Sequence, residues 1–591
     1  MRSLLVFHFI GALIFLILGT SADGVPKRKL KILIDNPAMA FSHMQFQGRL
    51  ADVLAEAGHE VHVLMLDIDP KMKDYNASTK IHKLMRIPRP KDKTDELEKM
   101  SGLRNPFLGM FNFGDMWMDF MTMWKDICRE LTHNRELMDQ LTAERYDVAI
   151  SEFYQFCSFA VFHRIGVKTK IGSLAIHLNN LAGSHFGIPM VSSYTPNMMA
   201  PLIDGMNLGF FDRTIKFYYD LYEANVLSPS YIHMHEPIVR QAFGQDFPPL
   251  KEIARNTSLI FTNANEVFEF PKPISNKVVY IGGIVQSKLK PLAENLKSIL
   301  ENSKKGAVLF SLGSVTDTTK MTDKLKQSFI TTFAKFPGFD FIWKIKVNQN
   351  DTKLFSSLPN IHVVDWVDQK TLLTHPKLVA FISHCGQNSL SEAAHSGVPL
   401  VGIPLFGDQV FNAALMKHKG IGEYVDIKTA EDPEVITQAL EKVLNDPKYR
   451  ENVKSIQKKL ELAPFKPEEK FVKWVEFAAE FPDLNELNLP TVEEMGVLAY
   501  YSLDVIFVSI FVFVVSLYVV AMAFRKLLHL YMHLVLVARA RKYVWRSVRI
   551  GLIRGLTEGA LICIARLGMC SYGENHSTAR LVIARADHCE P

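Results

Sequence analysis

Short apolar strands that alternate with helical stretches constrain the fold more than any other feature of this 591-residue chain. Amphipathic helical stretches separate these strands, as over 45–57, which ends at Gly58. Strands that alternate with helices form parallel sheets covered by helices, and a chain of this length exceeds one usual domain. The pattern predicts an α/β protein with two parallel-sheet domains in tandem. The predicted strands are 30–35 and 60–66 in the first series, and 306–312, 339–346, 361–367, 378–383 and 399–404 in the second.

The expected domain boundary lies in a stretch rich in proline and lysine that follows Gly282 and Gly283. We expect a first domain over 23–286 and a linker over 287–302. A second domain should cover 303–490, and the helical residues from about 432 to 480 should brace it.

Both ends of the chain carry membrane signals. An apolar run near the start, followed by small residues, predicts a cleaved signal peptide over 1–22. Residues 505–524 form an uncharged run, long enough at about 1.5 Å per residue to cross a bilayer core of roughly 30 Å. The tail over 525–591 begins with many basic residues, which mark the cytoplasmic side. We therefore expect a single-pass type I membrane protein with both domains in the lumen.

Charge and cysteine content exclude two classes of protein. The formal net charge is only +5, with many basic residues near the C-terminus, so a nucleic-acid partner is not expected. The cysteines expected in the lumen are Cys128, Cys157 and Cys385, an odd number that leaves at least one free thiol and excludes a disulfide-rich scaffold. The lumenal part also carries N-glycosylation sequons at Asn76, Asn256 and Asn350.

Metal-ligand motifs are absent from the sequence. The pairs His59/His62 and His233/His235 have no further ligands nearby, so we interpret them as structural and expect no metal site. The stretch 81–141 is rich in methionine and phenylalanine, which suits either a pocket for varied apolar ligands or an ordinary core.

The strongest candidate site follows the predicted strand 378–383. Ligands gather at the carboxyl ends of parallel strands, and a helix N-terminus beside such an end binds phosphate. His384 ends the strand, Gly386 allows close approach of the backbone, and Asn388 is the expected N-cap. We expect a pyrophosphate here, bound by the side chains of His384, Asn388 and Ser389. Glu392, one turn further on, is an acceptor suited to a ribose diol.

Neighbouring strand ends carry further binding groups. Asp408 and Gln409 follow the strand 399–404, and a carboxylate beside an amide can hold several sugar hydroxyls. Trp366 ends the predicted strand IHVVDW, where its indole can stack on a uracil ring while Gln369 bonds the base edge. These residues together predict a nucleotide-sugar site in the second domain.

The run HCGQNSLSEAAHSGVPLVGIPLFGDQ, preceded by WVDQKTLLTHP and by FSLGS, which ends at Ser314, resembles the signature of the UDP-glycosyltransferases. The likeness is strongest to the membrane-bound UDP-glucuronosyltransferases of animals and extends over nearly the whole chain. It implies a GT-B fold, in which two Rossmann-like domains face each other across a cleft. The first domain would bind the acceptor, and the second would bind the UDP-sugar, with Ser314 among its ligands. The resemblance also implies no cofactor and no catalytic metal.

The chemistry implied by the resemblance needs a base in the first domain. His43 follows the strand 30–35, and an imidazole can take the proton of an acceptor hydroxyl as its oxygen attacks the anomeric carbon. The family places an acidic residue after a strand like YDVAIS, and that position is Glu152 here, where vertebrate members usually carry aspartate. Asp147 is the rival carboxylate, but its place before the strand suits a capping or surface group. The implied reaction is a direct, inverting displacement.

Donor, acceptor and location are less narrowly defined. Family members that use UDP-glucuronic acid carry an arginine in a sequence like FPRP, where this chain has Lys272, so both UDP-glucose and UDP-glucuronic acid are candidates. The expected acceptors are small lipophilic hydroxyl compounds, as in the conjugation of xenobiotics or steroids. The family also implies the endoplasmic reticulum membrane, and a homodimer stays open. The alternative function is a catalytically silent, membrane-bound UDP-sugar-binding subunit.

Overall fold

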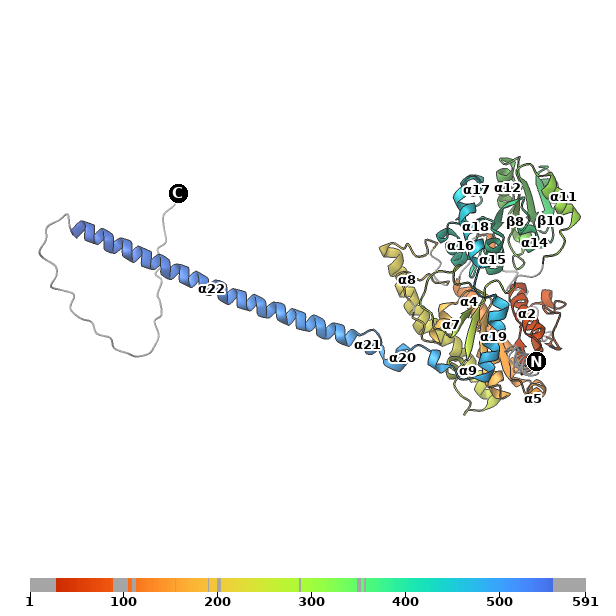
Figure 1. Cartoon of the computed structure of the whole chain (residues 1–591), viewed down its shortest axis with the longest axis horizontal. Coiled ribbons are helices and arrows are strands. Elements are labelled where there is room, and N and C mark those ends of the chain that lie inside the picture. Colours follow the sequence, from red (N-terminus) through yellow and green to blue (C-terminus); the bar gives the residue numbers. More distant parts are fainter. Residues whose placement is uncertain are drawn as a thin grey trace, which may run out of the picture. The chain divides into compact units, whose positions relative to one another are not determined.

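The computed structural model describes residues 28–88, 105–108, 113–154, 156–189, 191–198, 203–285, 289–347, 352–355 and 358–555. The expected signal peptide, the sequon at Asn350 and the tail after residue 555 lie outside these residues. The chain divides into two compact units, one ending at Met495 and the other starting at Gly496. The first unit contains both of the expected parallel sheets (Figure 1).

The first sheet has seven parallel strands in the order β3-β2-β1-β4-β5-β6-β7. Alternate residues of its strands face opposite cores: Ile32 and Ile34 pack on one side and Leu33 on the other. The strands are β1 (Lys31–Asp35), β2 (Glu60–Leu66), β3 (Lys83–Ile87), β4 (Val148–Glu152), β5 (Thr169–Leu174), β6 (Leu259–Thr262) and β7 (Val278–Tyr280). The helices are α2 (Phe41–Glu56), α4 (Phe113–His133), α5 (Arg135–Glu144), α6 (Phe156–Arg164), α7 (Asn180–Ser184), α8 (Phe210–Tyr222), α9 (Ser228–Phe243) and α10 (Leu250–Arg255).

The second sheet has six parallel strands in the order β10-β9-β8-β11-β12-β13. Its predicted strands are confirmed to within a few residues. They are β8 (Ala307–Ser311), β9 (Asp340–Lys344), β10 (Ile361–Val364), β11 (Leu378–Ser383), β12 (Leu400–Gly402) and β13 (Gly422–Tyr424). The helices are α11 (Glu294–Asn302), α12 (Asp323–Ala334), α13 (Thr352–Phe355), α14 (Gln369–Leu373), α15 (Gln387–Ser396), α16 (Gln409–His418), α17 (Pro433–Asn445), α18 (Pro447–Glu461) and α19 (Pro467–Glu480).

Two helices depart from the expected division of the chain. Helix α11 lies in the stretch expected to be a linker, yet Leu296 and Leu300 are buried in the core of the second domain. Helix α19 was expected to brace the second domain, but Phe471 and Val475 are buried in the core of the first. The chain thus returns to the first domain before it leaves the unit through α20 (Val492–Met495).

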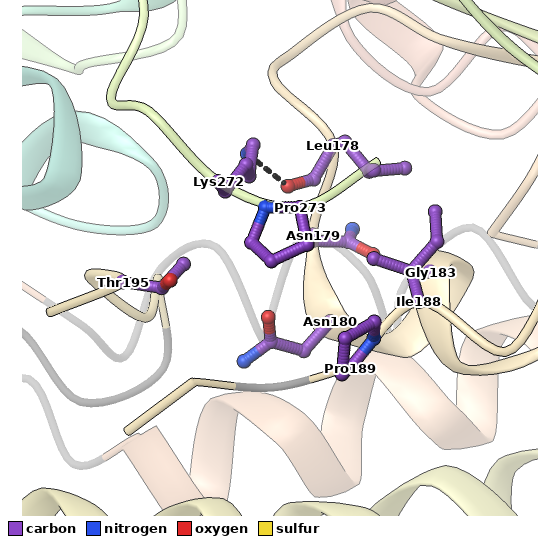
Figure 2. Close-up of a pocket in the computed structure, with 9 residues that line it drawn as sticks. All are labelled: Leu178, Asn179, Asn180, Gly183, Ile188, Pro189, Thr195, Lys272 and Pro273. Carbon is purple, nitrogen blue, oxygen red and sulfur yellow. Dashed lines mark hydrogen bonds between the residues drawn. The ribbon is translucent and has the colours of Figure 1, made fainter. Parts of the chain in front are cut away.

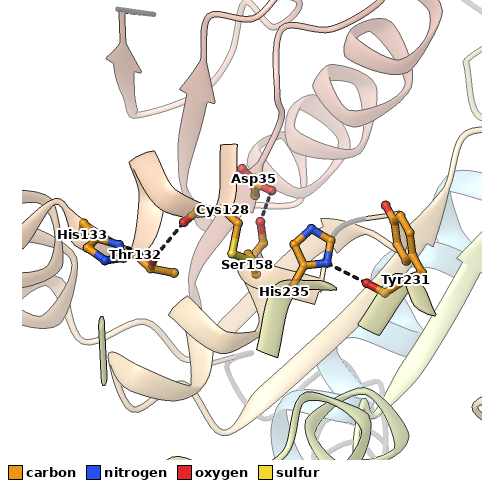
Figure 3. The surroundings of a disulfide bond; sticks show 8 residues. Asp35, Cys128, Thr132, His133, Ser158, Tyr231 and His235 are labelled. Atoms are coloured by element: carbon orange, nitrogen blue, oxygen red, sulfur yellow. Dashed lines mark hydrogen bonds between the residues drawn. A yellow bond between two sulfur atoms is a disulfide. The ribbon is translucent and has the colours of Figure 1, made fainter. Parts of the chain in front are cut away.

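A disulfide joins Cys128 of α4 to Cys157 of α6, and the remaining described cysteine, Cys385, is free and buried. Figure 3 shows the surroundings of the disulfide, where Thr132 Oγ1 donates to the Cys128 carbonyl at 2.8 Å. The Ser158 hydroxyl donates to the buried Asp35 carboxylate at 2.6 Å. The bridge therefore ties α4 to the helix that follows β4 in the core of the first domain. Met121 and Trp124, which belong to the methionine- and phenylalanine-rich stretch 81–141, are also buried in that core.

The second unit contains α21 (Val497–Tyr500) and the long helix α22 (Leu503–Gly555). The most apolar 18-residue window of α22 has a mean hydropathy of 2.9, and none of that window is buried against protein. By length and composition, residues 503–551 of α22 can cross a membrane. This stretch contains the predicted span 505–524.

Candidate active site

A histidine and a carboxylate from distant parts of the sequence meet at the carboxyl edge of the first sheet. His43 lies in the first turn of α2, which starts at Phe41 and not near Gln45 as expected, and Glu152 is the last residue of β4. Nδ1 of His43 lies 2.8 Å from Oε2 and 2.9 Å from Oε1 of Glu152. Oε1 also accepts the backbone N–H of Ala175 at 2.8 Å. The carboxylate is therefore held from two sides and orients the imidazole.

Charge determines the protonation behaviour of this pair. Burial by itself would lower the pKa of His43, but the adjacent Glu152 carboxylate outweighs it, with help from Asp408, and the pKa is raised above 6.5. Asp408 belongs to the second domain, and its own pKa is raised because burial exceeds the stabilising effect of His43. The expected base of the first domain thus faces the expected sugar ligand of the second.

The imidazole of His384 lies at the N-terminus of α15, closely confined by backbone. A Cβ atom on Gly386 would come within 2.6 Å of His384 Nε2, and one on Gly313 within 2.5 Å. Burial, followed by the charge of Lys344, lowers the pKa of His384 to about 4, so the ring is neutral at pH 7. Among the described residues nothing hydrogen-bonds its buried Nδ1. This unsatisfied nitrogen and the free N–H groups of the helix suit a phosphate.

The prediction that Asn388 caps this helix is wrong. Gly386 is the N-cap and makes no side-chain cap bond, so α15 begins at Gln387. Asn388 instead reaches the first domain, where its Oδ1 accepts Asn263 Nδ2 at 3.0 Å and its Nδ2 donates to Gln45 at 3.4 Å. The side chain joins the two domains beside the helix N-terminus.

Three of the predicted donor residues form one cluster. Nε2 of Gln369 donates to Ser389 Oγ at 3.0 Å and to Glu392 Oε2 at 2.7 Å. Burial raises the pKa of Glu392 to about 7, although Gln369 counteracts it. At pH 7 the Glu392 carboxyl group is therefore partly protonated, and it can both accept and donate hydrogen bonds to a diol.

Trp366 is 60% exposed, so much of its side chain is open to solvent. It lies two residues beyond β10, with Lys344 Nζ 4.2 Å from its ring centroid and Phe41 in edge contact at 5.9 Å. Lys344 ends β9 and donates to the Gly313 carbonyl at 3.2 Å. The sequence analysis did not identify Lys344 as a site residue, although a basic side chain near the carboxyl end of a predicted strand could have indicated it.

The remaining predicted residues differ in their surroundings. Asn412 donates to Asp408 at 2.7 Å. Gln409 is buried, and its Oε1 accepts the backbone N–H groups of Leu405 and Phe406 at 2.8 and 3.1 Å. Gln409 therefore fixes the loop that carries Asp408. Ser314 is exposed in the loop after β8.

Asp147, the rival carboxylate, lies at the opposite end of β4. It accepts the backbone N–H of Lys31 at 2.8 Å and forms an ion pair with Arg28. It is a surface capping group, as its position before the strand indicated. The described residues contain no group of three or more histidine, cysteine or acidic side chains that could hold a metal ion.

The geometry agrees with what comparison with known proteins finds. The profile of the family described as "UDP-glucoronosyl and UDP-glucosyl transferase" matches residues 31–540. The chain belongs to this family. It is a UDP-glycosyltransferase, and the match covers both sheets and every residue of the candidate site.

Relatives of this transferase are similar over most of their length. A Caenorhabditis elegans protein described as "Putative UDP-glucuronosyltransferase ugt-48" is 30% identical over 495 residues, which are 80% of this chain and 91% of that protein. Human UDP-glucuronosyltransferase 3A2 is 26% identical over 520 residues, 86% of this chain and 94% of the human one. The structure of CalG4, the calicheamicin glycosyltransferase, matches with a TM-score of 0.54 at 15% identity, over 76% of this chain and 98% of that one. The transferase therefore has the GT-B fold.

Proposed function

We propose that this transferase moves a hexosyl group from a UDP-sugar to a hydroxyl of a small lipophilic acceptor, as in the conjugation of xenobiotics or steroids. The observation that carries the proposal is the His43–Glu152 pair in the first domain, which faces Asp408 of the second. A silent UDP-sugar-binding subunit would not need this pair. Membership of a transferase family and an intact pair both support catalysis.

In the proposed reaction His43 is the general base. Its Nδ1–H donates to Glu152, so Nε2 carries the lone pair that takes the acceptor proton. The acceptor oxygen attacks the anomeric carbon as the bond to the UDP oxygen breaks, which inverts the configuration. Glu152 then stabilises the imidazolium that forms.

The second domain would hold the donor and stabilise the leaving UDP. His384 and the N–H groups at the start of α15 face the pyrophosphate, where negative charge develops. Glu392, held by Gln369, would accept the ribose hydroxyls, and Trp366 would stack on uracil. Asp408 would bind the sugar. This scheme uses no metal ion or cofactor, so we expect activity to persist in a chelator.

The surroundings of Lys272 favour UDP-glucose over UDP-glucuronic acid. Figure 2 shows its ammonium group at the edge of a small pocket, where it donates to the Leu178 carbonyl at 2.9 Å. The same group lies 3.9 Å from the buried Glu269 carboxylate, and the Lys272 side chain is only 8% exposed. Its charge is thus engaged within the first domain and is poorly available to a uronate.

We further propose that both sheets lie in the lumen of the endoplasmic reticulum, anchored by α22. The Cys128–Cys157 disulfide supports this location, because disulfides persist in oxidising compartments. Asn76 and Asn256 are exposed sequons. Treatment with endoglycosidase H should therefore increase the mobility of the membrane-bound protein, and an unchanged mobility would argue against glycosylated lumenal domains.

The proposed activity is tested by UDP release from the detergent-solubilised full chain with a panel of lipophilic phenols. UDP-glucose and UDP-glucuronic acid are compared at equal concentrations, with and without EDTA. Turnover with UDP-glucose, unaffected by EDTA, is the expected result. Faster turnover with UDP-glucuronic acid would overturn the donor assignment, and UDP binding without turnover would favour the silent subunit.

A further inference from the structure

Helix α8 buries charged side chains and exposes apolar ones, which is the reverse of an ordinary surface helix. Two of its charged residues, Lys216 and Asp220, and Glu223 just beyond its end are each at most 4% exposed. They lie at positions i, i+4 and i+7, which share one face of a helix. Lys216 Nζ pairs with Asp220 Oδ2 at 2.6 Å, and Asn197 donates to both Asp220 and Glu223, at 2.7 and 2.5 Å. The buried face is therefore a satisfied polar network.

The opposite face of α8 presents large apolar side chains to the outside. Eight of them, each between 43% and 78% exposed, are spread over about half of the helix circumference. An aromatic side chain offers roughly 150–250 Å² when exposed, so the face presents on the order of 800 Å² of apolar surface. The largest patch of a typical soluble monomer is about 300–600 Å². Seven of the eight side chains belong to α8, and the eighth, Val226, lies in the π-helical turn Glu223–Leu227 that follows it. The seven are Phe210, Phe211, Ile215, Phe217, Tyr218, Leu221 and Tyr222.

The C-terminal end of α8, which we call its base, lies close to the segment through which the chain leaves the first unit. Asn180 and Ser184 of α7 contact Glu223 and Ser228 at that base, at 3.2 and 3.3 Å. Only two residues after Ser184, the Phe186 carbonyl accepts the backbone N–H of Leu489 at 3.0 Å. The segment around Leu489, through which the chain leaves the unit, and the base of α8 thus both contact residues 180–186. Their contact points at Ser184 and Phe186 are within about 10 Å of each other along the chain.

We propose that the apolar face of α8 lies on the surface of the lipid bilayer as a second membrane contact. The proposal rests on the proposed anchoring by α22. The anchor helix begins at Leu503, eight residues after Met495, and eight residues reach at most about 28 Å. The end of the unit that carries α8 therefore stays within reach of the bilayer. Phenylalanine, tyrosine and leucine on one helix face are typical of helices that lie in a membrane interface.

This contact requires little charge on the lipid. Among the residues of α8 only Arg213 is an exposed charged side chain, since Asp212 is half-buried and the others are buried. Binding should therefore depend on apolar area and persist at high salt, and zwitterionic lipid should suffice. A second copy of the chain on the same face is the competing occupant.

The test uses the full chain, with a protease site inserted after Met495, reconstituted in phosphatidylcholine liposomes. Before cleavage the protein must float with the liposomes, and failure here would refute the anchor and not the α8 contact. After cleavage the released unit should still float, in about 0.5 M salt as well as at low salt. A variant with Phe211→Gln, Ile215→Gln and Tyr218→Gln should float at least about tenfold less after cleavage.

Two measurements keep the result interpretable. The uncut α8 variant should release UDP at the parent rate, which shows that it is folded. A matched variant, with Leu462→Gln, Phe465→Gln and Phe481→Gln on exposed apolar positions of other segments, should float like the parent after cleavage. If the cut parent stays at the bottom of the gradient as a monomer or as a dimer, the bilayer contact is refuted, and a dimer identifies the second copy as the occupant.

Discussion

Replacing Glu152 with glutamine tests the role of the carboxylate with almost no change in volume. The Ala175 N–H donates to Oε1, so the amide oxygen of the glutamine takes that position. The amide nitrogen then occupies the Oε2 position, 2.8 Å from His43 Nδ1. Its hydrogens oppose an Nδ1–H there, so the ring must reverse its tautomer or keep only the 2.9 Å contact with the Oε1 position, which is now an uncharged amide oxygen. In either case His43 is a poorer base, and no negative charge stabilises the imidazolium.

The size of this effect follows from the contacts. A charge-assisted hydrogen bond contributes about 1.5–3 kcal/mol, so losing it in the transition state should lower kcat roughly 10- to 200-fold. The tautomer penalty adds to this loss, and we expect at least about 100-fold. Glu152→Asp keeps the charge and should lose less than about tenfold. UDP release measures kcat, and calorimetry should give an unchanged Kd for UDP.

The pH profile of the same variant gives a second, independent readout. His43 must be neutral to accept a proton, and Glu152 raises its pKa above 6.5, so kcat/KM of the parent should fall as the pH drops through that raised value. Without the carboxylate, burial dominates and lowers the pKa, so the limb should move to lower pH. A Glu152→Gln enzyme within about fivefold of the parent kcat, with an unmoved limb, would refute the assigned role.

Three further predictions concern other parts of the structure. Gly386→Ala should weaken UDP binding at least about tenfold by calorimetry, because its Cβ would collide with His384; unchanged affinity would contradict the geometry. Removing the disulfide with Cys128→Ala should lower the free energy of unfolding by about 3.5 kcal/mol, since the bridge closes a loop of 29 residues. Denaturant titration measures this, and equal stability would mean that the bridge does not form in the protein. Lys272→Arg should raise the ratio of UDP-glucuronic acid to UDP-glucose turnover, and an unchanged ratio would exclude this position as a determinant of donor choice.

The strand pattern predicted both sheets and the edge on which the site lies, because a buried parallel strand has a strong local signal. The N-terminus of α2 was missed, because the expected helix began at residue 45, after His43. Ala40 is extended and makes no side-chain cap bond, so no capping residue marks the true start at Phe41. Local signals of this kind are the only ones that a single sequence offers.

Contacts between domains could not be predicted from local pattern. Asparagine is a residue type that is common at N-caps, yet the side chain of Asn388 forms hydrogen bonds with Asn263 and Gln45 across the domain boundary. Asp408 was expected near a sugar, but its electrostatic coupling to His43 depends on how the two sheets meet. The exposed face of α8 was missed because its apolar spacing also suits an ordinary buried helix stripe.

The central claim is that His43 removes the acceptor proton while the second domain binds the donor without its help. The most direct test compares single-turnover UDP release and UDP affinity for the parent and His43→Ala. We predict a loss in rate of at least about 1000-fold with a Kd for UDP within about twofold of the parent. A variant that turns over at a rate close to the parent would contradict the account.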